Sequence, residues 1–174
     1  MKHLGLSVGT LGIVLLAAGC CTDRPDNTVV AMAVLSSASG SAAGGTVNFI
    51  RYKNQIRVEA NFGGLSPGLH GFHIHETGDC SKPDATSAGG HFNPAGGHHA
   101  GPTDHDRHLG DLGNLEADTN GNAYYSRTFS DLTIEGERSI LGKAVIVHAK
   151  ADDFKTQPSG DSGDRISCGI IVRQ

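Results

Sequence analysis

Histidine is the residue type in this sequence whose number and spacing point most directly to chemistry. The chain has ten histidines, and eight of them lie between His70 and His108. Imidazole nitrogens are good ligands for copper and zinc ions. The clustering therefore predicts a metal site with ligands drawn from this part of the chain.

His73 and His75 form a chelating pair if they lie on a β-strand. Side chains on a strand alternate between its two faces, so both imidazoles would share one face while Ile74 points into the core. On its own this pair is a modest signal, because a solvated histidine pair would look the same. Further candidate ligands follow, namely His91, His98, His99, His105, His108, Asp111 and, after an apolar run at 144–147, His148. Three imidazoles with one carboxylate make a plausible four-coordinate zinc set.

These residues need a scaffold, and the composition favours one built from short strands. The 174 residues include 25 glycines, and only 18% are charged, which is typical of one turn-rich domain and not of a helix bundle. Residues 55–62 alternate between apolar and polar side chains, as a half-buried strand does. Eight segments have such character and no helix is expected: 28–35, 45–52, 55–62, 68–75, 113–117, 123–130, 141–148 and 168–173. This pattern predicts an all-β antiparallel sandwich or barrel.

Two connections between the predicted strands are unusually long, at 76–111 and 149–167. Loops of that length inside a compact domain are uncommon unless they are functional or are held by cross-links. The first carries five of the ten histidines and one cysteine, and the second ends beside Cys168. Metal ions and a disulfide could therefore supply the rigidity that these loops lack.

The charge balance argues against a nucleic-acid-binding protein. The chain has 18 acidic and 14 basic side chains, a net charge of −4, a sequence pI of about 6.2 and no run of basic residues. Proteins that bind nucleic acid need an excess of Lys and Arg to displace the counterions of the phosphates. We therefore expect no nucleic-acid partner.

Residues 1–19 have the pattern of a secretory signal peptide, with Lys2 ahead of an apolar stretch at 11–18. The segment is too short for a transmembrane helix. Small residues run directly into Cys20, as in the bacterial lipobox, which implies acylation of Cys20 and a lipid-anchor and linker segment at 20–27. The alternative is an ordinary signal-peptidase site near an incidental Cys20. Either way we expect export, and the lipobox reading implies a periplasmic protein tethered to a bacterial membrane.

Export would place the other cysteines, Cys21, Cys80 and Cys168, in an oxidising compartment. A disulfide between Cys80 and Cys168, which both lie inside the predicted domain, is the natural expectation and leaves Cys21 over. A bond between positions so far apart would constrain the unfolded chain by roughly 4–5 kcal/mol. Its role would be structural.

Six longer motifs occur in order along the chain: Gly71-Phe-His-Ile-His-Glu76, Gly78-Asp-Cys-Ser81, Ser87-Ala-Gly-Gly-His-Phe-Asn-Pro94, Arg107-His-Leu-Gly-Asp-Leu-Gly-Asn114, Ile146-Val-His-Ala149 and Asp164-Arg-Ile-Ser-Cys-Gly169. Together they resemble the motifs of the copper/zinc superoxide dismutases in their bacterial exported form, a family already known for its sandwich fold. The resemblance covers residues 28–174. It implies one dismutase-like domain with an eight-stranded antiparallel Greek-key sandwich or barrel and two long functional loops.

The resemblance also implies one copper and one zinc ion per subunit. The copper ligands would be His73, His75, His91 and His148, and the zinc ligands would be His91, His99, His108 and Asp111. Asp152 matches a carboxylate that links a copper histidine to a zinc histidine. His99 is preferred to His98 because it precedes Pro102 by three residues, as the family's ligand does. His98 and His105 would then be solvated, His70 would brace the fold, and the disulfide would join Cys80 to Cys168.

The implied activity is conversion of two superoxide radicals and two protons to O₂ and hydrogen peroxide by Cu(II)/Cu(I) cycling, as protection against exogenous superoxide. His91 would act in catalysis as a proton carrier, and Arg165 would guide the superoxide anion. Electrostatic steering is a known property of this family and is not a deduction from the sequence. Lys150 and Lys155 are weaker candidates for that guiding role. A homodimer is compatible with the sequence, although no predicted strand shows an unambiguous interface.

Two other functions are compatible with part of this pattern. A non-enzymatic copper-delivery or copper-buffering protein could share the fold, but such relatives often lack a copper ligand or the guiding arginine, and both are present here. A purely structural zinc protein would leave His73, His75 and His148 unexplained. The sequence therefore favours the enzyme.

Overall fold

Alternating burial along the strands shows why this sequence folds into a closed sheet. In the computed structural model, which describes Met1 and residues 26–174, Ile56, Val58, Ala60 and Phe62 are all buried on one face of strand β3 (Gln55–Gly63). The polar residues between them face outward or lie half-buried. The predicted alternation is confirmed for this strand, and it places one face of β3 in the core.

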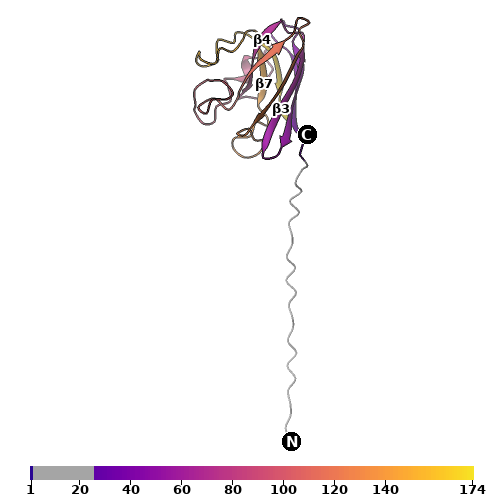
Figure 1. Cartoon of the computed structure of the whole chain (residues 1–174), viewed down its shortest axis with the longest axis vertical. Helices are drawn as coiled ribbons and strands as arrows, with labels where there is room; N and C mark the ends of the chain where they lie inside the picture. The colour runs from indigo at the N-terminus through magenta and orange to yellow at the C-terminus, as the bar shows by residue number, and fades with distance from the viewer. Residues whose placement is uncertain (2–25) are drawn as a thin grey trace.

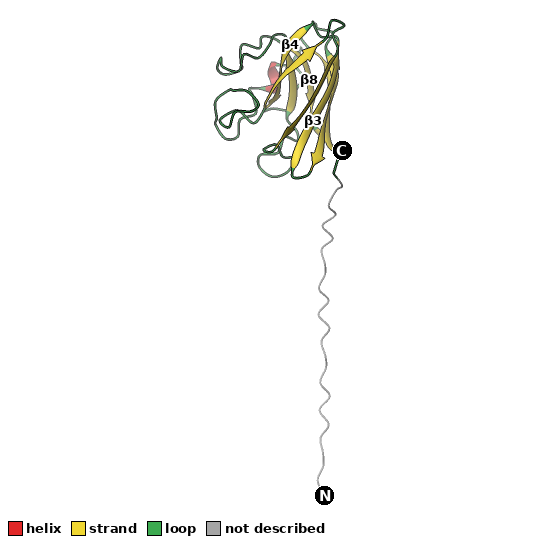
Figure 2. Ribbon diagram, in the orientation of Figure 1, coloured by secondary structure: helices red, strands yellow, loops and turns green. Residues whose placement is uncertain are grey.

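The described residues form a closed antiparallel barrel (Figures 1 and 2). Neighbouring strands follow the order β2-β3-β6-β5-β4-β7-β8-β1, and the pairing of β1 with β2 closes the sheet. Adjacent strands that are far apart in sequence, such as β3 with β6 and β4 with β7, give the Greek-key connectivity. The other strands are β1 (Val29–Ser37), β2 (Gly44–Tyr52), β4 (Gly68–His75), β5 (Asp111–Ala117), β6 (Ala123–Phe129), β7 (Ala144–His148), β8 (Arg165–Ile170) and β9 (Val172–Arg173).

The predicted strands differ from the observed ones mainly near the C-terminus. The segment predicted at 168–173 begins earlier, at Arg165, and is interrupted at Ile171, which leaves the two-residue strand β9. The interruption has a physical reason, because Ile171 is buried in the core while its main chain pairs with Lys143 and Gly142. A single-turn 3₁₀ helix at Thr86–Ala88 corrects the expectation of no helix.

Both long loops lie on the same side of the barrel in Figure 1, next to strands β4 and β7. The core inside the barrel is formed by large apolar side chains such as Phe49, Phe72 and Leu115, all inaccessible to solvent. In the part of the chain that the structure describes, no helix is long and apolar enough to cross a membrane. The predicted signal peptide 1–19, Cys20, Cys21 and most of the segment 20–27 lie outside the described residues.

Candidate metal centre

Strand β4 delivers the first two histidines to the side of the barrel that carries the loops. Its register against β5 shifts between Phe72 and His73, while His73 and His75 pair with β7 through Ile146 and Ala144. Ile74 lies between them and is buried in the hydrophobic core. The alternation predicted for this stretch is thus observed.

Two further histidines complete a four-histidine cluster, which consists of His73, His75, His91 and His148. His148 ends strand β7, and His91 comes from the first long loop, where it forms an isolated β-bridge with His75. One nitrogen from each of the four side chains lies within 4.8 Å of the others, and all four residues are buried. These are the four positions expected to bind copper.

The nitrogens of this cluster face one another as ligands do, and not as hydrogen-bonded partners. His75 donates its Nδ1 hydrogen to the carbonyl of Gly89 at 2.9 Å, and His148 donates its own to the carbonyl of Gly163 at 3.1 Å. Their Nε2 atoms therefore carry lone pairs and lie only 3.4 Å apart. Among the described residues, Nδ1 of His73 and Nε2 of His91 are buried without a hydrogen-bond partner. Since buried polar atoms are normally paired, a cation at this point would satisfy all four nitrogens.

Burial favours the neutral form of His73, His75 and His148, which is the form that binds a metal ion. Loss of solvation lowers the pKa of His73 and His75 well below the usual value, and the neighbouring histidines lower it further. Burial likewise lowers the pKa of His148 to about 4. These three side chains therefore present lone pairs, not protons, near neutral pH.

A second cluster, the histidine–aspartate cluster, consists of His91, His99, His108 and Asp111. The Nδ1 atoms of its three histidines converge on Oδ1 of Asp111, at 2.8 Å for His91, 3.1 Å for His99 and 3.5 Å for His108. The other carboxylate oxygen of Asp111 accepts main-chain hydrogen bonds from Ala100 and His108, which fix its orientation. Three imidazoles and one carboxylate are a typical zinc donor set.

The charges in this second cluster also suit a cation. Burial opposes ionisation of Asp111, but hydrogen bonds from His91 and His99 hold the pKa of its carboxyl well below the usual range. Burial likewise opposes protonation of His99, yet hydrogen bonds to Asp111 and Asp152 outweigh it and raise the pKa of His99 to about 9. A buried carboxylate surrounded by imidazoles therefore attracts positive charge to this point.

Asp152 connects the two clusters. One of its carboxylate oxygens accepts a hydrogen bond from Nε2 of His73 and the other from Nε2 of His99, each at 2.8 Å. Both imidazoles then turn their Nδ1 atoms toward the metal-ligand positions. The carboxylate therefore lies between one histidine of each cluster.

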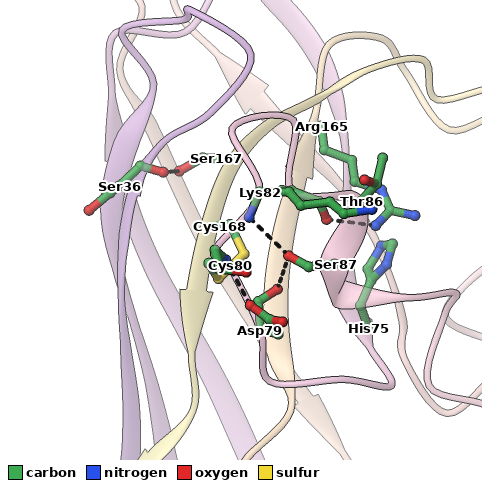
Figure 3. The surroundings of a disulfide bond; sticks show 12 residues. Ser36, His75, Asp79, Cys80, Lys82, Thr86, Ser87, Arg165, Ser167 and Cys168 are labelled. Atoms are coloured by element: carbon green, nitrogen blue, oxygen red, sulfur yellow. Dashed lines mark hydrogen bonds between the residues drawn. A yellow bond between two sulfur atoms is a disulfide. The ribbon is translucent and has the colours of Figure 1, made fainter.

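Arg165 lies at the start of β8 and lines a cleft of about 370 Å³ above the four-histidine cluster, together with His75, His91 and His148. Its guanidinium donates hydrogen bonds to the carbonyls of Ala85 and Gly89, at 2.8 and 2.7 Å. Figure 3 shows this side chain reaching toward His75. The contacts attach the arginine to the first long loop and keep its positive charge beside the cleft.

The disulfide predicted between Cys80 and Cys168 is present and joins the first long loop to β8 (Figure 3). Cys168 is buried beside Ala85 and Ala88, in a small apolar cluster apart from the main core. The loop is held further by Ser87, which donates a hydrogen bond to the carbonyl of Asp79. The same loop segment thus carries both the disulfide and the carbonyls that hold Arg165.

The remaining predicted residues fall into two groups. His98, His105, Lys150 and Lys155 are exposed. His70 is buried outside both clusters, with Nδ1 2.8 Å from the carbonyl of His148 and Nε2 2.8 Å from that of Ser66. Its position fits a brace between β4 and the end of β7.

Sequence reasoning missed two amide side chains at this centre. The amide of Asn114 donates to the carbonyl of Asp152 at 3.0 Å and accepts from its main-chain N–H at 2.8 Å. Gln157 forms an equivalent pair with the main chain of His99. Asn114 is the last residue of the motif at 107–114, so that motif could have identified it, whereas nothing in the local sequence marks Gln157.

Comparisons with known proteins agree with this geometry. Residues 43–171 match the family model described as copper/zinc superoxide dismutase (SODC). An extracellular superoxide dismutase [Cu-Zn] from Brugia pahangi is 39% identical over 154 residues, which cover 83% of this chain and 76% of that protein. A crystal structure of the clock protein EA4 superposes with a TM-score of 0.74 at 36% identity, and the match covers 85% of this chain and 98% of that one.

Proposed function

Because the chain belongs to the copper/zinc superoxide dismutase family, we propose that its two clusters divide the work of superoxide dismutation between a copper site and a zinc site. The four-histidine cluster would hold copper and the histidine–aspartate cluster would hold zinc. The observation that carries this assignment is His91, which belongs to both clusters. Its Nδ1 faces Asp111, while its buried Nε2 has no partner among the described residues.

The protein is an oxidoreductase that converts two superoxide radicals and two protons to O₂ and hydrogen peroxide. Bound copper supplies one-electron redox chemistry by alternating between Cu(II) and Cu(I), whereas zinc keeps one oxidation state. The chain's own residues must bring in the anion, orient the ligands and deliver protons.

His91 is our candidate for the proton carrier. Its Nε2 faces the four-histidine cluster and, like Nδ1 of His73, lacks a hydrogen-bond partner among the described residues. We propose that this nitrogen takes up a proton when superoxide is oxidised and returns it as peroxide forms. Nδ1 would stay in the zinc set throughout, which keeps the ring in place while the proton moves.

Arg165 is our candidate for the residue that attracts the substrate. Superoxide is an anion, and the chain carries a net charge of −4, so the molecule as a whole repels it. A fixed positive charge beside the cleft can reverse this repulsion locally, as is known for superoxide dismutases. The two carbonyl contacts of Arg165 keep its guanidinium beside the cleft.

A copper-delivery protein on the same fold is the competing function. It would need a site that releases copper to a partner, whereas this cluster offers four buried histidine nitrogens. The arginine beside the cleft also has a clear purpose for an anionic substrate and none for copper transfer. Both observations favour the enzyme.

Replacing the shared ligand tests the proposal. His91→Ala should leave three copper ligands and three zinc ligands, change the copper spectrum, and lower activity by more than about 100-fold, since changes outside the ligand shell alone often cost 10–100-fold. The matched control is His98→Ala, because His98 lies nearby in sequence and is exposed. A His91→Ala protein with one copper and one zinc per chain and an unchanged copper spectrum would refute the shared-ligand assignment.

We further propose that the protein is exported to the periplasm and is tethered to a bacterial membrane through lipidated Cys20. The support is the signal-like segment 1–19 and the small residues before Cys20, and a matching relative is named as extracellular. The mass of the mature N-terminus, compared between wild type and Cys20→Ser, would reveal the acyl groups. An unmodified N-terminus in the wild type would contradict the anchor. Homodimer formation stays a prediction, for which sedimentation of the purified domain is the measurement.

A further inference from the structure

The two long loops meet at the main chain of His99. Gln157, from the second loop, accepts a hydrogen bond from the His99 N–H at Oε1 and donates one from Nε2 to the His99 carbonyl, both at 2.8 Å. The two residues are 58 positions apart in the chain. A side-chain amide thus pairs with both main-chain groups of one residue, as a neighbouring strand would.

The same stretch of the second loop also holds the His99 side chain. Asp152 accepts a hydrogen bond from Nε2 of His99, so residues 152–157 contact this histidine at its ring and at its backbone. Gly160 closes the turn, with its N–H bonded to the carbonyl of Thr156. A Cβ at Gly160 would collide with Oδ1 of Asp152 and lie 2.7 Å from Nε2 of His99, so the turn lies directly against this pair.

His99 has no regular secondary structure to fix it. It lies in the long loop between β4 and β5, whereas His73, His75 and His148 lie on strands. Its ring is completely buried and its Nδ1 lies 3.1 Å from Oδ1 of Asp111. The main-chain position of His99 therefore depends on contacts with other parts of the chain, and Gln157 supplies two of them.

We propose that Gln157 is a positioning residue for the zinc site, and that it couples zinc retention to the conformation of the second long loop. The inference rests on the proposed function, in which His99 is a zinc ligand. Gln157 does not contact the ligand nitrogens; it fixes the backbone that carries one of them. An exposed side chain thereby controls how firmly a buried ion is held.

Another role for this residue would be to hold the second loop over the copper cleft, since the following residues Pro158 and Ser159 line that cleft. That role predicts changes in the access of anions to copper, with normal zinc retention. The positioning role predicts faster zinc release with normal access of anions to copper. Measurements on the two ions therefore separate the two roles.

The test uses the full mature protein loaded with copper and zinc. Gln157→Ala should release zinc to an excess of chelator about tenfold faster than wild type, the lower end of the usual cost of losing a residue that supports a ligand. Cobalt(II) bound in place of zinc should show an altered visible spectrum, because the geometry around His99 relaxes. Azide binding at copper should stay the same, and the melting temperature of the metal-free protein shows whether the variant folds.

Two further variants act as controls. Lys155→Ala changes an exposed residue in the same loop. The hydrogen bonds of Lys155 to Asp153 and Gln157 are made by its main chain, which the substitution keeps, so zinc release should match wild type. Gln157→Glu keeps the length and the acceptor for the His99 N–H but cannot donate to the His99 carbonyl when ionised. Its zinc release should lie between those of wild type and Gln157→Ala.

The positioning role would be overturned if Gln157→Ala released zinc at the wild-type rate and gave the wild-type cobalt spectrum. Altered azide binding with normal zinc release would overturn it too, in favour of the role at the copper cleft. Failure of the underlying assignment gives a different result: His99→Ala would then retain zinc as wild type does, which shows that His99 is no ligand.

Discussion

Strands β1, β2 and β3 and the two long loops on the other side of the barrel are held in place by different interactions. The strands bury apolar side chains such as Val47, Phe49 and Val58 and pair with one another through main-chain hydrogen bonds. The loops bury fewer apolar side chains, such as Phe92 and Leu109, and are held in addition by buried polar contacts, by the disulfide and by the two candidate metal clusters. We therefore expect β1 to β3 to depend less on metal ions and cross-links than the loops do, so that the two regions respond separately to perturbation.

Metal removal should have the largest effect. Chelation should abolish activity and loosen residues 76–110 and 149–164, because converging nitrogens and a carboxylate would lose the ions that they share. Amide hydrogen exchange read by mass spectrometry should show faster exchange in these loops and little change in β1 to β3. Equal deprotection of both regions would contradict the division between them.

Loss of the disulfide should have the second largest effect. Reduction of the Cys80–Cys168 bond should destabilise the metal-free protein by roughly 4–5 kcal/mol on the loop-entropy model, since the two cysteines are 88 residues apart. The loop at 76–110 should become the main site of proteolysis. The metal-loaded protein should lose less, because the ions still anchor the loop. The pairing would lose its structural role if reduced and oxidised metal-free forms resisted protease equally.

A change in the barrel should show the opposite selectivity. Phe49→Ala removes a side chain that is inaccessible to solvent, far in sequence from either long loop, and should lower the free energy of unfolding by about 3–5 kcal/mol. Copper and zinc content and activity of the folded protein should stay near wild type. Chemical denaturation and elemental analysis are the measurements, and loss of metal from the folded variant would show that the two regions are coupled.

Arg165→Glu should have the smallest effect on the structure and a selective effect on rate. We expect a roughly tenfold lower second-order rate, at the low end for electrostatically steered association, which is itself a known property of superoxide dismutases. Wild-type rates should fall as the Debye length shortens from about 30 Å at 0.01 M to about 8 Å at 0.15 M salt. The variant should show a flat or inverted dependence, with unchanged metal content. Identical salt profiles would leave Arg165 as an ordinary surface charge.

The strands were the easiest part of this molecule to predict. In β3 apolar and polar residues alternate along the sequence, and the apolar ones are the buried ones. Ile56 and Val58 could therefore be assigned to the core without knowledge of the residues that pack against them. The H-x-H pair followed from the same rule of alternation. The break at Ile171 could not be predicted, because it depends on the core position that this side chain fills.

Which groups approach one another across the long loops depended on the tertiary structure. The sequence alone identified His91, His99 and Asp111 as candidate ligands, because histidine and aspartate reveal their chemistry by residue type. It could not show which ring nitrogen of His91 faces which cluster, nor that Gln157 pairs with the backbone of His99. The alternation of a strand relates adjacent residues, so it can be recognised from a short stretch of sequence. Contacts between loop positions 58 residues apart arise only when the closed barrel brings both loops to one side, so the three-dimensional fold decides them.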